Sequence, residues 1–195
     1  MQKSSKSIII NTVFILIIFF SGSPSTYADE KKDPNIKFLQ DKLKDIIPGA
    51  EYWPTFEKNL SDQFEARLAQ VKVRKSDSVL LSGMEDWSMP IASAHGEGYA
   101  QFTEGHLEKL MNTNQIALNF VNSNGVNTEA YPLNPNGSID GATGITAADG
   151  RVTIMMPHPE RVFRKLQMSW KPEHWGEYSP WMQIFMNAKK FSENS

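Results

Sequence analysis

The pattern of apolar and polar residues predicts regular structure from residue 36 to the end of the chain. Apolar residues recur at helical spacing before Pro48-Gly49, which would end the helix: Ile36, Leu39, Leu43, Ile46 and Ile47. Residues 64–73 alternate like a half-buried strand. Similar patterns predict strands at 78–84, 89–102, 115–121, 128–134 and 151–156, helices at 104–111 and 180–191, a turn at 122–125 and a loop at 135–144. We therefore expect an α/β protein with a layered sheet.

The first 28 residues have the layout of a secretory signal peptide. Lys3 and Lys6 give a basic start, an apolar run follows at 8–20, and Thr26 and Ala28 are suitably placed before a cleavage point. The apolar run is short for a membrane-spanning helix, which needs about 20 residues. An uncleaved N-terminal anchor and a buried helix are the alternative interpretations.

These features divide the chain into three parts. Residues 1–28 are predicted to be a signal-like helix that acts as a signal peptide or anchor, residues 29–35 a charged linker, and residues 36–195 one domain. The leader predicts a secreted or envelope protein. Membrane contact is expected only through residues 8–20, and only if the leader is not cleaved.

Composition excludes several classes of function. The formal net charge of the 195-residue chain is −2, which gives no reason to expect nucleic acid or an anionic membrane surface as a partner. The chain contains no cysteine, so it has no disulfide, no thiolate metal site and no cysteine nucleophile of its own. Its four histidines do not show the spacing of a zinc site, and no metal site is predicted.

Candidate chemistry is concentrated where the apolar strand 151–156 ends. His158 and Glu160 follow this strand and are separated by Pro159. Residues two apart on extended backbone point to the same side, so the carboxylate can reach the imidazole. A carboxylate paired with histidine fixes the tautomer of the ring and makes it a general base. The alternative is a structural histidine in a turn stiffened by proline.

Longer motifs carry a resemblance to a known family. The segments "LNPNGSIDGATGITAADGRVTIMMPHPERVFR", "SWKPEHWGEYSPWMQIFMNAKK", "IIPGAEYWPTFEKNLSDQFEARLAQVKV" and "MPIASAHGEGYAQF" resemble the C-terminal end of phosphoribosylformylglycinamidine synthase, large form, over residues 43–192. That region of the family is a class I glutamine amidotransferase (glutaminase) domain with a flavodoxin-like α/β sheet and a Cys-His-Glu triad. It hydrolyses glutamine to supply ammonia for the ATP-dependent amidation of formylglycinamide ribonucleotide in de novo purine biosynthesis.

The resemblance also implies roles for individual residues. His158 and Glu160 fall on the histidine and glutamate of the triad. His95 and Gly96 would contact the amino-acid end of glutamine, although the same stretch can be a tight connection with one surface histidine. The synthetase part of the family, which uses ATP and magnesium, has no counterpart in this chain, so no cofactor is expected here.

The departure from the family concerns the nucleophile. Without gaps, the alignment places the family's cysteine near Pro34, and no thiol is present there or elsewhere. The sequence therefore predicts a truncated glutaminase domain with a triad remnant, inactive alone, with an exposed sheet edge. Such a fragment would need an upstream segment in trans or would self-associate. The family is cytoplasmic whereas the leader indicates export, which leaves localisation open.

Three hypotheses follow from the sequence. The chain is the glutaminase part of a glutamine-dependent ligase that receives its nucleophile from another segment. Alternatively, it is an exported, non-catalytic module that binds glutamine. The third hypothesis is a decayed reading frame without a function of its own.

Overall fold

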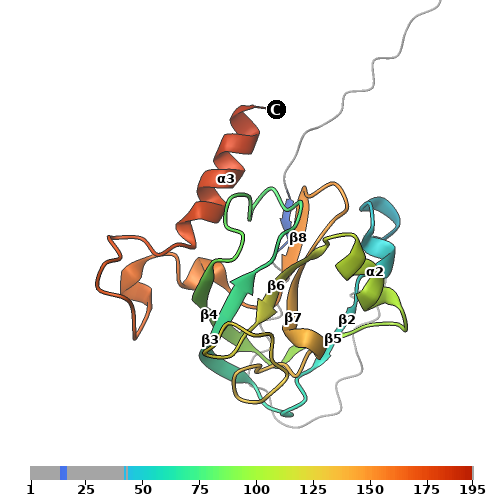
Figure 1. The fold of residues 1–195 in the computed structure, drawn as a ribbon, viewed down its shortest axis with the longest axis horizontal. Coiled ribbons are helices and arrows are strands. Elements are labelled where there is room, and N and C mark those ends of the chain that lie inside the picture. Colours follow the sequence, from blue (N-terminus) through green and yellow to red (C-terminus); the bar gives the residue numbers. More distant parts are fainter. Residues whose placement is uncertain (1–13, 17–41, 43, 195) are drawn as a thin grey trace, which may run out of the picture.

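The structure is a computed structural model that describes residues 14–16, 42 and 44–194. Its largest element is a sheet of six strands (Figure 1). From one edge to the other the strands are β1 (Phe14–Leu16), β8 (Val152–Met155), β7 (Ala142–Thr146), β6 (Ile116–Phe120), β3 (Glu65–Val73) and β4 (Ser88–His95). β1 runs parallel to β8, and the other neighbouring pairs are antiparallel.

The remaining elements are shorter. A second sheet pairs β2 (Thr55–Lys58) with β5 (Glu97–Gln101) in antiparallel orientation. The helices are α2 (His106–Asn112) and α3 (Met182–Glu193), and the 3-10 turns are η1 (Ala50–Tyr52), η2 (Ile139–Gly141), η3 (Pro159–Arg161) and η4 (Lys165–Gln167). Within the described ranges, no helix has the length and apolar character needed to cross a membrane.

Two hydrophobic clusters cover opposite faces of the six-stranded sheet. One joins β3, β4 and β6 to α3 and contains the fully buried side chain of Trp181. The other joins β7 and β8 to α2 and η1 and contains the buried Leu110. The helices α3 and α2 therefore lie on opposite sides of the sheet (Figure 1). β8 contributes to both clusters, Ile154 to one and Met155 to the other, so it is buried on both faces.

Most of the predicted elements are confirmed, and with them the α/β class with a layered sheet. The strands predicted at 64–73, 89–102, 115–121 and 151–156 correspond to β3, β4 with β5, β6 and β8, and the helices predicted at 104–111 and 180–191 to α2 and α3. The predicted turn contains Gly125 at a φ of 73°. Residues 42 and 44–46 are helical before Gly49, whose φ of 81° ends the helix, and the earlier part of that predicted helix lies outside the described residues.

Two predicted strands are wrong. Residues 78–84 form turns instead: Met84 N donates to the Leu81 carbonyl oxygen, and the side chain of Asn187 donates to the carbonyl oxygens of Leu80 and Ser82, so these groups are not paired in a sheet. Residues 128–134 also form a turn: the side chain of Asn134 donates to the carbonyl oxygens of Thr128 and Ser138 and folds the segment back on itself. The loop predicted at 135–144 ends early, since β7 begins at Ala142.

The N-terminal apolar run enters the fold at three residues. Phe14–Leu16 form β1, a strand, where the sequence predicts part of a signal-like helix. A run of consecutive apolar residues is also the pattern of a parallel strand, which explains how it can pair with β8. The rest of residues 1–28 and the linker 29–35 lie outside the described residues.

Replacing Trp181 by alanine is expected to destabilise the domain strongly. The indole is fully buried between α3 and the sheet, and its Nε1 donates to the Pro90 carbonyl oxygen at 2.7 Å. Truncating such a side chain costs about 3–5 kcal/mol of unfolding free energy. Urea denaturation measures this loss. Trp170, which is 66% exposed, is the matched control, and Trp170→Ala is expected to change stability by about 0.5 kcal/mol or less. Equal losses in both variants would contradict the assigned packing.

Candidate active site

His158 lies directly after β8 and is held by its backbone. Its N–H donates to the Ala92 carbonyl oxygen of β4 at 2.7 Å, and the two residues form an isolated antiparallel bridge. β8 and β4 are separated by three strands in the order of the sheet. The segment after β8 therefore crosses to the far strand, and Pro157 and Pro159 limit the conformations of this crossing.

The side chains of His158 and Glu160 are in direct contact. His158 Nδ1 lies 2.9 Å from Glu160 Oε1, and the histidine is 3% exposed. Arg161 Nε lies 3.5 Å from the same carboxylate oxygen. Because an ionised carboxylate only accepts hydrogen bonds, this contact places a proton on Nδ1, and in the neutral form of the ring Nε2 is then the basic nitrogen. This is the pairing expected of a general base, and its catalytic role stays a prediction.

His95 lies beside this pair, at the end of β4. Its ring centroid is 6.0 Å from that of His158, and its Nε2 is 2.8 Å from Asn136 Oδ1. The amide oxygen accepts, so Nε2 carries the proton and Nδ1 is an acceptor. His95 is 1% exposed, so it is not the surface histidine of the alternative interpretation. None of the described residues pairs with its Nδ1.

The pKa of His95 is held below its ordinary value. Burial is the largest cause, because it penalises the imidazolium form, and the neighbouring His158 lowers the pKa further. The hydrogen bond with Asn136 and the carboxylate of Glu65 act in the opposite direction. His95 is therefore a neutral ring at neutral pH, able to accept one hydrogen bond and donate another.

Gly96 allows a bend in the chain next to His95, and Gly98 leaves space for the His95 ring. The chain leaves the large sheet at His95 and enters the small sheet at Glu97, so Gly96 is the bend between them. The bend is fixed by Asn59, whose N–H donates to the Gly96 carbonyl and whose Nδ2 donates to the His95 carbonyl. A Cβ on Gly98 would lie 2.5 Å from His95 Nε2, so glycine leaves room for that ring.

Sequence analysis missed two residues that contact this group of histidines. Asn136 comes from the loop before β7, and nothing in the sequence connects it with His95. Glu65 is paired with His95 across the β3–β4 ladder, is 1% exposed, and forms an ion pair with Arg67. The alternation of residues 65, 69, 71 and 73 puts Glu65 on the buried face of its strand, a signal that was available in the sequence.

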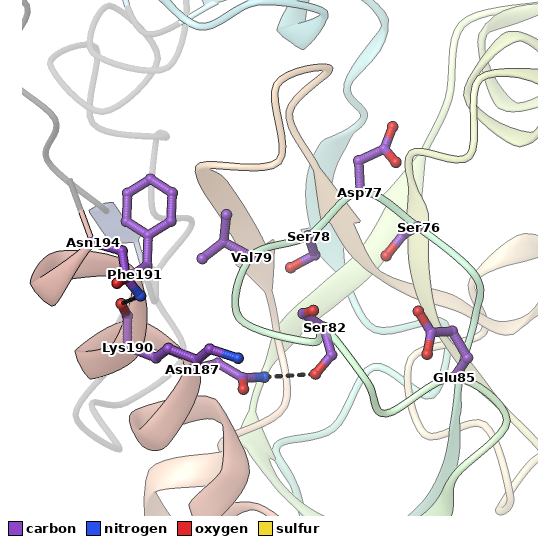
Figure 2. A pocket seen from close by; sticks show the side chains of 10 residues that line it. All are labelled: Ser76, Asp77, Ser78, Val79, Ser82, Glu85, Asn187, Lys190, Phe191 and Asn194. Atoms are coloured by element: carbon purple, nitrogen blue, oxygen red, sulfur yellow. Dashed lines mark hydrogen bonds between the residues drawn. The ribbon is translucent and has the colours of Figure 1, made fainter.

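A cavity lies elsewhere in the described structure. It has a volume of about 470 Å³ and is lined by residues of the 76–85 segment and of α3 (Figure 2). Asn187 of α3 donates to the carbonyl oxygens of Leu80 and Ser82, and Figure 2 shows the bond to Ser82 at the wall of the cavity. Ser78, also in the wall, bonds to Thr153 near the start of β8, whereas His158 follows the end of that strand. The cavity is therefore separate from the histidine site.

Among the residues that the structure describes, no three histidine, aspartate or glutamate side chains are arranged so that they could hold a metal ion. The site contains instead a carboxylate-oriented imidazole next to a buried neutral histidine. Such a pair can take a proton from a nucleophile and can hold a polar ligand by hydrogen bonds. It contains no thiol, because the chain has none.

Known proteins share sequence features and the fold with this chain. Residues 37–192 match the model of the CobB/CobQ-like glutamine amidotransferase domain, and the chain therefore belongs to that family. The structure is also similar to that of PurLQS from Thermotoga maritima, with a TM-score of 0.52 and 21% sequence identity, over 71% of this chain and 53% of that one. This chain thus spans about half the length of the chain it matches. The resemblance to a glutamine amidotransferase domain and its fold is confirmed.

Adding a methyl group at Gly98 is expected to disrupt the site. The new Cβ would lie 2.5 Å from His95 Nε2 and 2.7 Å from Asn136 Cγ, so the His95–Asn136 hydrogen bond has to break. Loss of such a buried bond costs about 1–3 kcal/mol. Gly96→Ala is the control, because nothing lies within 4 Å of a Cβ there. Thermal unfolding and the NMR signals of the His95 ring report both effects, and an unchanged Gly98→Ala protein would contradict the geometry.

Acid is expected to destabilise the fold through His95. Because burial lowers the pKa of His95 below the value of about 6.5 in an unfolded chain, the unfolded state binds more protons as the pH falls below 6.5. The unfolding free energy therefore decreases in that range, and the contribution is fully present above it. Urea denaturation at pH 8 and pH 5 should show a smaller decrease for His95→Gln than for the unmodified protein. The exposed His174 is the control, and His174→Gln should keep the full decrease.

Proposed function

We propose that this domain is the glutaminase part of a phosphoribosylformylglycinamidine synthase-type enzyme. In this proposal, His158 is the general base and Glu160 orients it, while the nucleophile comes from a segment outside the domain. The observation that carries the proposal is the 2.9 Å contact between His158 Nδ1 and Glu160 Oε1 at the end of β8, in a chain matched to a glutamine amidotransferase family. ATP-dependent amidation would take place on another part of such an enzyme.

The charge distribution of the dyad supports this role. Glu160 accepts a hydrogen bond from the Nδ1–H group of His158, so Nε2 is the nitrogen that would receive a proton from an attacking group. When the ring becomes an imidazolium, the same carboxylate stabilises the positive charge. The second histidine suits a different role, because burial keeps His95 neutral and so favours hydrogen bonding to substrate over proton transfer.

Buried polar atoms without partners support a ligand site. Buried polar groups in proteins are nearly always hydrogen-bonded. Five atoms on the residues of this region are buried without a partner among the described residues: Asn59 Oδ1, Ser93 Oγ, His95 Nδ1, Asn136 Nδ2 and Glu160 Oε2. Together they offer donors and acceptors, as glutamine requires through its amide, amino and carboxylate groups.

Glutamine binding is the first test of the proposal. Titration of the full chain with glutamine, followed by NMR, is expected to shift the amide signals of His95, Gly96 and His158. Asparagine, which is one methylene shorter, should bind more weakly by about 1–3 kcal/mol. His95→Gln should weaken glutamine binding, whereas the exposed His174→Gln should not. Complete absence of shifts at millimolar glutamine would overturn the assignment of the site.

Ammonia release tests the catalytic part. The chain alone should release no ammonia from glutamine, because it contains no thiol. Mixed with a polypeptide that carries the cysteine elbow of a phosphoribosylformylglycinamidine synthase, it should show turnover that falls about 10²–10⁴-fold in His158→Asn. Glu160→Gln should reduce turnover as well, because the amide can select the wrong tautomer of His158. Turnover that is insensitive to His158→Asn would refute the base assignment.

The absence of cysteine favours a second candidate function, binding of glutamine without hydrolysis. Such a module would bind glutamine in the same NMR titration. It would stay inactive in the presence of the cysteine-bearing polypeptide, which separates the two functions.

A further inference from the structure

The outer edge of β8 is covered by a segment from the opposite end of the sequence. Phe14, Ile15 and Leu16 pair in parallel with Val152, Thr153 and Ile154. β8 is buried on both faces, and its other edge is taken by β7. An open edge on such a strand would expose unpaired backbone groups and invite association with other chains.

We propose that the outer edge of β8 is a strand-acceptor site, that Phe14–Leu16 of the same chain fill it, and that this part of the N-terminal apolar run is a structural strand of the domain. From the sequence alone, the apolar run was interpreted as an export signal, an anchor or a buried helix. Its composition suits the site, because a parallel strand inside a layered sheet is a continuous apolar run.

Hydrogen bonds on the β7 side show which backbone groups of β8 need a partner on the other side. The Val152 carbonyl accepts from Ala147 N, and Met156 N donates to the Thr143 carbonyl, so residues 152, 154 and 156 turn their backbone groups toward β7. Successive residues of a strand turn these groups to opposite sides. Thr153 and Met155 therefore direct their N–H and C=O groups toward β1.

The register of the β1–β8 pair shows which residues of β1 direct their backbone groups toward β8. Thr153 is opposite Ile15. In a parallel ladder a residue bonds to the neighbours of the residue opposite it, so Thr153 is expected to bond to the backbone of Phe14 and Leu16. Ile15 turns its N–H away from β8. Proline, which has no N–H, is tolerated on an edge strand where that group points outward, and it breaks the ladder where the group points inward.

The position of β1 bears on the histidine site. Parallel strands end at the same edge of a sheet, so the carboxyl end of β1 points toward the edge where His158 follows β8. If the proposed function holds, a segment that added to β8 in order to bring a nucleophile to His158 would have to displace β1. The occupancy of the β8 edge itself does not depend on that function.

Hydrogen exchange of the full chain tests the proposal. The amides of Thr153 and Met155 should be protected in the unmodified protein. Leu16→Pro should speed their exchange at least tenfold, whereas Ile15→Pro, the matched control, should leave it within about twofold. Fast exchange of both amides in the unmodified protein, or equal exchange in the two variants, would overturn the proposal.

A cross-link gives a second measurement that does not rely on proline. Because the chain has no cysteine, the only thiols in Phe14→Cys/Val152→Cys are the two introduced ones. A short bifunctional thiol reagent should join them within one chain. The control, Phe14→Cys/Ser88→Cys, places the second thiol on β4 at the other edge of the sheet and should give little product. Equal yields would refute the pairing, and a product of dimer mass would show that a second copy supplies the strand.

Discussion

The hydrogen bond from His158 N to the Ala92 carbonyl oxygen is the contact on which the site depends. It joins the segment that leaves the buried strand β8 to β4, the strand at the other end of the strand order. Since His95 ends the same strand β4, this bond brings two histidines far apart in the sequence to a ring separation of 6.0 Å. Without it, the Glu160-bearing turn would have no fixed position relative to His95.

Local contacts were accessible from the sequence, and long-range ones were not. The contact between Glu160 and His158 was predicted from their separation of two residues and is present, although residues 159–161 form a 3-10 turn and not the extended backbone that the prediction assumed. The strand 151–156 follows from its apolar composition. The partnership of His95 with Asn136 spans 41 residues and depends on how a loop returns to the sheet. The segment 78–84 was misassigned because its leucines are held by turns and by Asn187 of α3, a contact that no local pattern encodes.

The site contains an imidazole oriented by a carboxylate, but no thiol that this imidazole could deprotonate. Burial keeps His95 neutral, and the carboxylate of Glu160 orients His158. These are the features that make an imidazole useful next to an amide substrate, yet the chain contains no thiol. Under the proposed function, this domain supplies the base and the ligand contacts, and the bond-forming step depends on a second component. Membership of the glutamine amidotransferase family therefore does not by itself establish that this chain hydrolyses glutamine.

The pairing of β1 with β8 has a consequence for the order of events during biosynthesis. The acceptor strand is translated long after the apolar run has left the ribosome, because most of the chain lies between them. Until β8 emerges, Phe14–Leu16 have no acceptor strand in the sheet, so pairing at this edge is a late step of folding. The last contact of the six-stranded sheet to form therefore joins the first of its strands in the chain to the last.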